Sequence, residues 1–448
     1  MRKLASVLIM LLFMTPANAD PAGPPNDDGP RIAVARSFMT AFNSSSPTAL
    51  RVLVPDGALV AAYLKTRREI GELTLKGIVD AGPRQTTVLA FGKNGAVYHV
   101  VMWFKLPSVT LLSRVDFEPA LAPPVIGASV TELSFVRDLN AYIGSAATHG
   151  FYSGTVLVAK AGAPFFSRAY GSASVEYGVA NTMQTRFNIS SIGKLFTHVA
   201  IGQLLQQGKI SESDTIGKWL PDYPNQAAKA VTIAQLVDMS SGIGDFFTPK
   251  FARTPPGEFR SLEDYLPAFA TDPLAFPPGT GNLYSNGGYL VLGLIVQKAS
   301  GENYYDYVAR HIFAPAGMTH SGYPFADDVM RGRATGYSRP APGEPAHTTI
   351  FVEPARGSSA GGAFSTAGDL LNFATALRSG GLLDPRWTKW MLPPGSSFGV
   401  AGGTAGWNAF LDMESDTDYT VVVLANIDPP AAEDLGVEIV RWTRHIKP

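Results

Sequence analysis

Residues 187–196 read FNISSIGKLF, where two adjacent serines precede a lysine. The run that follows, KLFTHVAIGQLL, carries apolar residues at helical spacing, so a helix is predicted to start in this segment. Ser191 and Lys194 are three residues apart and therefore lie on the same face of its first turn. Ser190 is out of this spacing, and either it or Asn188 can cap the helix.

This spacing suits a nucleophile and its base. A hydroxyl at the first turn sits at the positive end of the helix dipole. A lysine one turn further on can accept the hydroxyl proton, provided that burial lowers the lysine pKa. The alternative is a capping serine beside a solvated lysine. S-x-x-K occurs once in the sequence, and on spacing alone the alternative is favoured.

A second motif changes that balance. The segment FPPGTGNLYSNGGYLVLGLIV places Tyr284 and Asn286 in a glycine-rich loop just before an apolar helix. Two residues apart on an extended loop, both side chains can face one cleft. The phenol can relay a proton and the amide can hold a substrate carbonyl. Another Y-x-N, at residues 223–225, is interpreted as an ordinary turn.

Together, the S-x-x-K and Y-S-N motifs resemble those of the β-lactamase-related serine hydrolases, which include class C β-lactamases, D-alanyl-D-alanine carboxypeptidases and family VIII-type esterases. The flanking segments SGTVLVAK, VTIAQLVDMSSGI and GGAFSTAGDLLNFATAL agree in order across residues 131–430. The resemblance implies an α+β, β-lactamase/transpeptidase-like fold, in which an antiparallel sheet is flanked by helices beside a helical subdomain. It also implies that Ser191 is the acylating nucleophile, Lys194 its base or orienting partner, Tyr284 the proton relay and Asn286 a substrate amide contact.

The third motif of this family lies on the edge strand that lines the cleft, and it usually reads Lys or His, a small residue, then Gly. The matching stretch, FGVAGGTAGWNAF, has Val400 in place of the cation. By resemblance, Gly402 and Gly403 bind the substrate, and the N–H groups of Ser191 and Gly403 form the oxyanion hole. Loss of the cation removes positive charge beside a substrate carboxylate. Uncharged esters are therefore favoured over β-lactams and D-Ala-D-Ala ends.

A competing motif, G-x-S-x-G at residues 357–361, would make Ser359 a nucleophile with Asp428 and His445 as partners. A nucleophile elbow needs a strand directly before the serine and a helix directly after it. Here GAF intervenes, and Thr366 or its neighbour starts the helix. We therefore interpret these glycines as a tight loop packed under the site.

Composition excludes several classes of protein. The net charge is −1 and charged residues make up 16%, which leaves no basic surface for nucleic acid. The absence of cysteine excludes disulfides and thiolate catalysis. The seven histidines are scattered without ligand spacing, so neither a metal site nor a cofactor is predicted. The expected partner is a small-molecule or peptide substrate.

The N-terminus, MRKLASVLIMLLFMTPANAD, has the pattern of a signal peptide at residues 1–19. A basic start precedes a short apolar run and an A-x-A cleavage site. The run is shorter than the roughly 20 residues needed to span a bilayer. We therefore expect an exported protein, periplasmic or secreted, without a transmembrane anchor in its mature form.

Two domains are predicted. Helical patterns followed by alternating strands over residues 31–118 indicate a small α+β domain, which resembles the curved-sheet NTF2-like or cystatin-like domains. A proline-rich linker spans residues 119–130, and the hydrolase domain spans residues 131–448. Strands at both ends of this second domain must meet in one sheet to satisfy their backbone groups.

The predicted function is that of an exported serine hydrolase that forms an acyl-enzyme, with an esterase on small or peptidic acyl substrates favoured. One alternative is a weakly active or inactive binding protein on the β-lactamase fold, motivated by Val400. The other is a D-Ala-D-Ala carboxypeptidase or a β-lactamase-like amidase.

Overall fold

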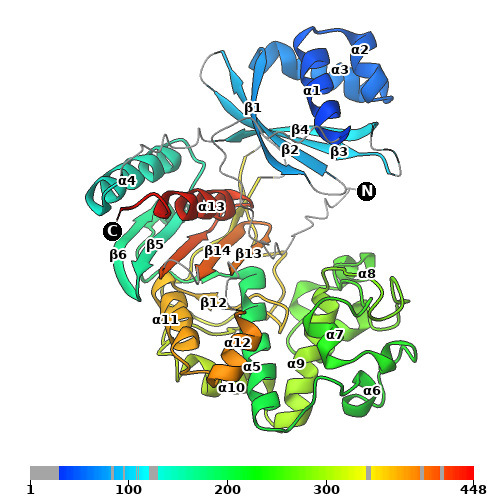
Figure 1. Ribbon diagram of the computed structural model, residues 1–448, viewed down its shortest axis with the longest axis vertical. Helices are drawn as coiled ribbons and strands as arrows, with labels where there is room; N and C mark the ends of the chain where they lie inside the picture. The colour runs from blue at the N-terminus through cyan, green and yellow to red at the C-terminus, as the bar shows by residue number, and fades with distance from the viewer. Residues whose placement is uncertain are drawn as a thin grey trace. The chain divides into compact units, whose positions relative to one another are not determined.

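In the computed structural model, the described residues group into two units with separate hydrophobic cores (Figure 1). One unit lies within Ala17–Pro124 and the other within Val125–Pro448. The predicted signal peptide and residues 121–129 of the predicted linker lie outside the described residues. The described residues are 30–81, 85–93, 96–106, 108, 110–120, 130–339, 345–393, 398–413 and 418–447.

The N-terminal unit has three helices followed by an antiparallel four-stranded sheet of order β1-β2-β3-β4. Ser46 and Asp56 cap the second and third helices through their side-chain oxygens. Phe38 and Phe42 of α1 pack with Tyr63 and Phe117 at the centre of its core. The elements are α1 (Pro30–Asn43), α2 (Pro47–Leu53), α3 (Gly57–Ile70), β1 (Leu73–Ala81), β2 (Gln85–Gly92), β3 (Val97–Phe104) and β4 (Leu112–Ala120).

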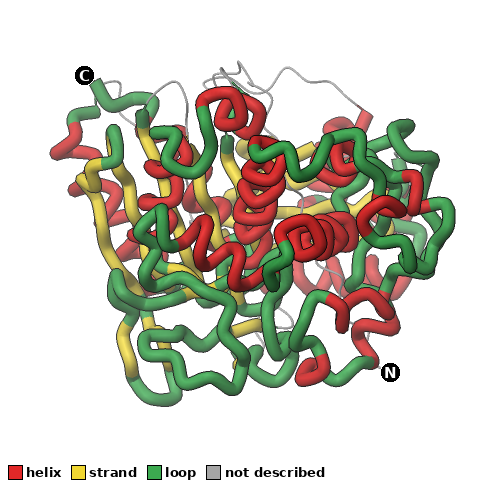
Figure 2. The backbone as a smooth tube through the Cα atoms, turned by 90° about the horizontal axis from the view of Figure 1, so that it is seen from below, coloured by secondary structure: helices red, strands yellow, loops and turns green. Residues whose placement is uncertain are grey.

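The C-terminal unit is built on a five-stranded antiparallel sheet of order β13-β14-β15-β5-β6. Strand β15, near the end of the chain, pairs with β5, near the start of the unit, with Val422 opposite Leu157. Strands from both ends of the unit thus meet in one sheet, as predicted. Figure 2 shows these strands running side by side. They are β5 (Gly154–Lys160), β6 (Ala163–Tyr170), β13 (Gly399–Thr404), β14 (Trp407–Met413) and β15 (Tyr419–Ala425).

Helices cover both faces of this sheet. The helices α4 (Glu132–Thr148) and α13 (Ala431–Thr443) contact each other on one face, and α11 (Ala367–Arg378) packs against β5 and β15 from the other (Figure 1). Edge strand β13 packs against a 3-10 turn, η1 (Ser190–Gly193), which leads into helix α5 (Lys194–Gln206). This contact fixes the place of the S-x-x-K motif beside the sheet edge.

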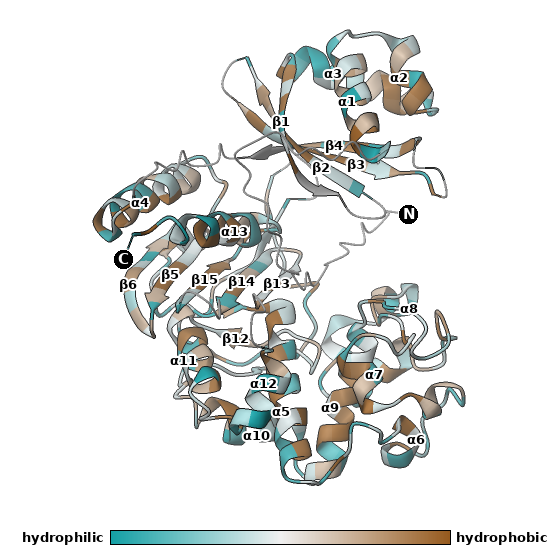
Figure 3. Cartoon of the chain, viewed as in Figure 1, coloured by the Kyte–Doolittle hydropathy of each residue, from teal (hydrophilic) through white to brown (hydrophobic). Residues whose placement is uncertain are grey.

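The helical subdomain is centred on α5 and α9 (Asn286–Ser300), which pack against each other. Every residue of α9 from 286 to 296 is buried, and the helix is apolar in Figure 3, as expected for a helix enclosed on all sides. The other elements of the unit are β7 (Ser172–Ser174), β8 (Val179–Ala180), β9 (Phe187–Asn188), α6 (Ile216–Trp219), η2 (Ala228–Ala230), α7 (Ile233–Val237), α8 (Pro249–Arg253), η3 (Pro256–Glu258), η4 (Glu263–Ala268), α10 (Tyr304–Val308), η5 (Ala309–Phe313), β10 (Tyr337–Ser338), β11 (His347–Thr348), β12 (Phe364–Ser365) and α12 (Pro385–Met391).

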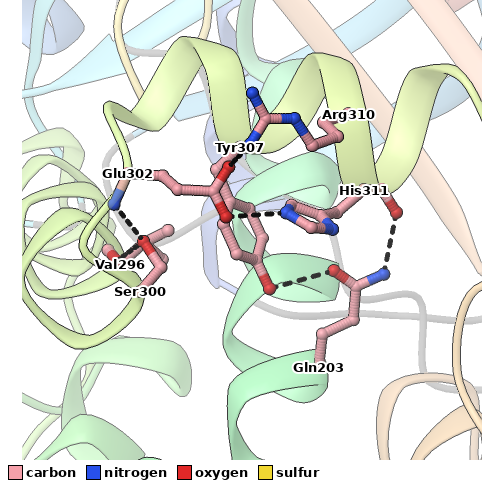
Figure 4. A network of polar contacts seen from close by, with 7 residues as sticks. All are labelled: Gln203, Val296, Ser300, Glu302, Tyr307, Arg310 and His311. Carbon is pink, nitrogen blue, oxygen red and sulfur yellow. Dashed lines mark hydrogen bonds and ion pairs between the residues drawn. The ribbon is translucent and has the colours of Figure 1, made fainter.

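A polar network ties the C-terminal turn of α5 to the helices that follow α9 (Figure 4). Gln203 accepts a hydrogen bond from the Tyr307 hydroxyl at 3.2 Å and donates to the carbonyl of His311 at 3.0 Å. Glu302 in turn pairs with the His311 ring and with Arg310. Because α5 carries the S-x-x-K lysine, this network helps to hold that lysine in register. The architecture confirms the predicted α+β class, with an antiparallel sheet flanked by helices beside a helical subdomain.

Candidate active site

The turn that carries Ser191 is shaped by residues on either side of it. Ser190 has a positive φ of 47°, and its N–H donates to Asn188 Oδ1 at 2.8 Å. The prediction that Asn188 or Ser190 caps the helix is wrong, because the N-cap residues of η1 and α5 are Ile189 and Gly193 and neither helix has a side-chain cap. The hydroxyl of Ser190 is buried and has no partner within the described residues. The strained turn points Ser191 toward the side chains of the other motifs.

The structure brings the candidate nucleophile, base and proton relay together. Ser191 Oγ lies 3.1 Å from Lys194 Nζ and 2.7 Å from the Tyr284 hydroxyl. Ser191 is 7% exposed and Lys194 is 3% exposed. The serine and the tyrosine are 93 positions apart in the sequence. The hydroxyl of Ser191 can therefore pass its proton to Lys194 without an intervening water.

Lys194 lies in a buried cage of acceptors and aromatic rings. Its Nζ donates to Asn286 Oδ1 at 2.6 Å and to the carbonyl of Ala360 at 2.5 Å. The ring centroids of Tyr284 and Tyr289 lie 4.8 and 5.7 Å from Nζ. Burial lowers the pKa of the Lys194 ammonium to about 7, against a smaller raising effect of the Asp245 carboxylate. A substantial fraction of the lysine is therefore neutral near pH 7 and able to accept a proton.

Tyr284 is suited to carry a proton in its neutral form. Burial raises the pKa of its phenol well above the ordinary value, while the hydrogen bond with Ser191 acts in the opposite direction. At neutral pH the phenol is protonated and can accept from one group while it donates to another. This behaviour is what a proton relay between nucleophile and leaving group requires.

Asn286 and Asp245 complete the buried polar cluster. Asn286 Nδ2 donates to Asp245 Oδ2 at 2.7 Å, while its Oδ1 faces Lys194. The sequence prediction included Asn286 but missed Asp245, which is 41 positions away. The signal was available in part, because Asp245 directly follows the segment VTIAQLVDMSSGIG, most of which carries the family resemblance.

Gly402 and Gly403 lie on edge strand β13, opposite Ala409 and Asn408 of β14. A Cβ on Gly402 would come within 2.7 Å of the Ser191 backbone nitrogen, so only glycine lets the strand approach the turn this closely. β13 is the outermost strand of its sheet, so alternate backbone N–H groups point away from β14. Gly402 therefore borders the nucleophile, whereas a Cβ on Gly403 would meet Pro429 and Asn408. The substrate-binding role of both glycines stays a prediction.

Val400 occupies the third-motif position with an apolar side chain. It is 3% exposed and forms part of the main hydrophobic core. It lies two residues before Gly402 on the same strand and therefore on the same face, the one that packs against η1. The face of β13 that approaches Ser191 thus carries an apolar group where the related enzymes carry a cation.

The residues of the competing G-x-S-x-G motif do not form a triad. Ser359 is fully buried, and its Oγ lies 3.5 Å from the carbonyl of Leu290. Asp428 accepts from the backbone N–H of Gly406, and the His445 ring bonds the carbonyl of Arg441. The loop instead packs under the site, where the Ala360 carbonyl accepts from Lys194, as predicted.

Within the described ranges, no group of three or more His, Cys, Asp or Glu side chains could hold a metal ion. Nor does any helix in that part of the chain have the length and apolar character needed to cross a membrane.

The chain is similar in sequence to several known proteins. The family model described as Beta-lactamase matches residues 135–441. The putative penicillin-binding protein PbpX of Bacillus subtilis (strain 168) is 29% identical over 286 residues, which cover 61% of this chain and 70% of PbpX. Protein flp of Staphylococcus aureus (strain N315) is 31% identical over 186 residues, 41% of this chain and 37% of flp. The match thus spans little more than a third of that relative.

Solved structures show the same fold. A penicillin binding protein from Bacillus halodurans has a TM-score of 0.61 and 29% sequence identity, with 70% of this chain and 99% of that chain covered. EstCE1, a hydrolase with promiscuous acyltransferase activity, has a TM-score of 0.60 at 20% identity and covers 69% of this chain. Since the family model spans more than half of the chain and the fold agrees, the chain belongs to the beta-lactamase family of serine hydrolases.

Proposed function

We propose that this chain is an exported serine hydrolase that acts through an acyl-enzyme, with uncharged esters of small or peptidic acids as its preferred substrates. The observation that carries the proposal is the buried contact of Ser191 Oγ with Lys194 Nζ at 3.1 Å. A neutral lysine at this distance activates a hydroxyl that is otherwise a weak nucleophile at neutral pH.

The proposed reaction has two halves. Ser191 Oγ attacks the carbonyl carbon while its proton passes to Lys194 Nζ, and the carbonyl oxygen becomes an oxyanion held by the N–H groups of Ser191 and Gly403. The intermediate collapses to the acyl-enzyme, and the leaving alkoxide takes the proton of Lys194 through Tyr284, which leaves the lysine neutral again. Water then attacks the acyl carbon and loses a proton to Lys194. The bond to Ser191 Oγ breaks, and this oxygen takes the proton from Lys194, which releases the acid and regenerates Ser191.

Ester preference is proposed from Val400. An apolar side chain on the site-facing side of β13 supplies no charge for a substrate carboxylate. An ester without a carboxylate loses nothing by this change, whereas a β-lactam or a D-Ala-D-Ala end would leave its carboxylate without a counter-charge. The export part of the proposal rests on the signal-peptide pattern of residues 1–19 alone.

A fluorophosphonate probe tests the nucleophile. We expect the wild-type protein to be labelled covalently and Ser191→Ala to show no labelling, with p-nitrophenyl ester hydrolysis lost in parallel. Ser359→Ala is the matched control, because this buried serine belongs to the competing motif, and we expect labelling of it to persist. Equal labelling of wild type and Ser191→Ala would refute the assignment.

The substrate preference is tested with p-nitrophenyl esters, D-Ala p-nitroanilide and nitrocefin on one preparation. We expect ester hydrolysis to exceed turnover of both amide substrates. Nitrocefin turnover as efficient as ester turnover would contradict the argument from Val400.

A binding protein is the second candidate, because Val400 removes a group on which related sites rely. If the wild type hydrolyses none of these substrates and Val400→His creates activity, this candidate is correct. If the wild type hydrolyses esters, it is excluded.

A further inference from the structure

We infer that Asp245 is a positioning residue of this site, whose carboxylate holds the Asn286 amide in the orientation that directs the free electron pair of Lys194 at Ser191. The inference rests on the proposed function, since it concerns how Lys194 acts as a base. Asp245 contacts none of the reacting atoms, and its effect reaches Ser191 through two intervening side chains.

Both oxygens of the Asp245 carboxylate are engaged. Oδ1 accepts the backbone N–H of Phe247 at 3.0 Å, which ties the carboxylate to its own turn. Oδ2 accepts from Asn286 Nδ2 at 2.7 Å and so reaches the first residue of α9. One bond fixes the carboxylate and the other transmits its position to the site.

The carboxylate decides which way round the Asn286 amide lies. An amide side chain can exchange its oxygen and its nitrogen by turning about its last bond, and both orientations fill the same space. An ionised carboxylate only accepts hydrogen bonds, so the nitrogen of Asn286 must face Asp245. The oxygen is then left facing Lys194, as the 2.6 Å contact shows.

The orientation of Asn286 in turn decides which neighbour receives the lysine electron pair. Lys194 Nζ has three oxygen neighbours, namely Ser191 Oγ, Asn286 Oδ1 and the carbonyl of Ala360. A neutral amine has two N–H donors and one electron pair. The amide and carbonyl oxygens can only accept, so they take the two N–H groups. Ser191 is the one neighbour of the three that can donate, and the electron pair is left for its proton.

Without the carboxylate, the Asn286 amide is no longer held in one orientation. If Asn286 turned over, its Nδ2 would compete with the Ser191 hydroxyl for the electron pair of Lys194. The lysine would then be a poorer base at an unchanged distance from the serine. Asp245 therefore plays a part similar to that of a carboxylate that orients a histidine base in other serine hydrolases.

The charges around Lys194 make the inference measurable. The groups that face Nζ are the Tyr284 and Tyr289 rings, the Asn286 amide, the Ala360 carbonyl and the Ser191 hydroxyl. Both phenols have raised pKa values because they are buried, and they are neutral in the working range. On this face strand β13 presents Val400, Gly402 and Thr404, none of which carries a charge. The one charge with a resolved influence on the pKa of Lys194 within the described residues is that of Asp245, which raises it.

Three variants separate charge, hydrogen bonding and local structure. Asp245→Asn removes the charge but keeps an oxygen that can accept from Asn286, and Asp245→Ala removes both. Asp238→Asn is the matched control, because Asp238 also accepts the N–H of the residue two positions on, and it has no resolved influence on the Lys194 pKa. The rate of labelling by a fluorophosphonate probe is measured against pH for each.

We expect the acid limb of the pH profile to move down by about 0.5–1 pH unit in Asp245→Asn and Asp245→Ala, because the lysine loses a nearby negative charge. The plateau rate should fall about 10–100-fold in Asp245→Ala and much less in Asp245→Asn. Asp238→Asn should match the wild type. Unmoved acid limbs and plateau rates in both Asp245 variants would overturn the inference. If Asp245→Ala does not fold, the inference is tested by the acid limb of the pH profile of Asp245→Asn.

A measurement without turnover separates this inference from the proposed function. In protein labelled with carbon-13 at lysine Cε, the Lys194 signal is assigned by its loss in Lys194→Met, and its titration midpoint is followed by NMR. A midpoint that falls in Asp245→Asn supports the inference, even if an unlabelled wild type overturns the hydrolase proposal. A midpoint that stays in place while the wild type is labelled normally overturns this inference alone.

Discussion

At the scale of single residues, the site depends on a buried cation that lacks an ion pair within the described part of the chain. Lys194 is surrounded by neutral oxygens and aromatic rings, and burial lowers the pKa of its ammonium to about 7. A lysine at the surface would be protonated at neutral pH and useless as a base. The same S-x-x-K spacing on an exposed helix would therefore carry no chemistry, which is why spacing alone left the motif ambiguous.

The pKa of Lys194 predicts the acid limb of activity. Because the proposed mechanism needs the neutral amine, kcat/KM for a p-nitrophenyl ester should be half-maximal near pH 7 and fall about tenfold per pH unit below it. Lys194→Met should abolish turnover at all pH values. A profile that stays flat down to pH 5 would show that Lys194 is not the base.

At the scale of elements, the site is assembled where turn η1 meets edge strand β13. Gly402 makes this approach possible, since a Cβ there would lie 2.6 Å from the Ile189 carbonyl oxygen and 2.7 Å from the Ser191 nitrogen. Both are backbone atoms that cannot move aside as a side chain can. Gly402 of the third motif therefore has a steric role that does not depend on a cation at position 400.

Gly402→Ala should displace the turn that carries Ser191. We expect a loss of at least about 100-fold in kcat/KM with a modest fall in melting temperature, because small misplacements of reacting groups are costly. Gly144→Ala is the control, as a Cβ on this α4 glycine would meet nothing within 4 Å. Wild-type activity in Gly402→Ala would show that the strand can withdraw without disturbing Ser191.

At the scale of the whole molecule, two hydrophobic cores correspond to the two units. His198 belongs to the larger unit and lies one turn beyond Lys194, where its ring packs edge-on against Trp390 at 4.6 Å. Its Nε2 is buried and has no hydrogen-bond partner within the described residues. It is thus a packed helix histidine.

His198 predicts a loss of stability in mild acid. Burial lowers the pKa of its imidazole to about 4 in the folded protein, against an ordinary value of 6.5. The unfolded chain therefore binds a proton that the folded chain does not between these values, and stability falls as the pH drops from 6.5 to 4. The loss should amount to about 1–3 kcal/mol.

His198→Phe preserves the ring contact and removes the titration. The free energy of unfolding, measured by urea denaturation at a series of pH values, should fall less steeply between pH 6.5 and 4 in this variant. His347→Phe, at an exposed position, should keep the wild-type slope. Identical slopes for wild type and His198→Phe would contradict the prediction.

Much of the larger unit could be predicted from local sequence. Hydrophobic periodicity and turn residues act over a few positions, so the helix after Ser191 and the strands at both ends of the unit were foreseeable. The S-x-x-K and Y-S-N motifs pointed to four side chains that the structure joins by hydrogen bonds. These motifs could be recognised because the residues of each motif lie within one turn of one another.

Other features were decided by the tertiary structure alone. The Ala360 carbonyl meets Lys194 across 166 positions, and Asp245 meets Asn286 across 41, through loops with no shared local pattern. Burial sets the pKa of Lys194, and burial is a property of everything packed around a residue. The local sequence determined which residues carry functional groups. The packing of residues distant in the sequence determined the neighbours of these groups, their charge states and hence their chemistry.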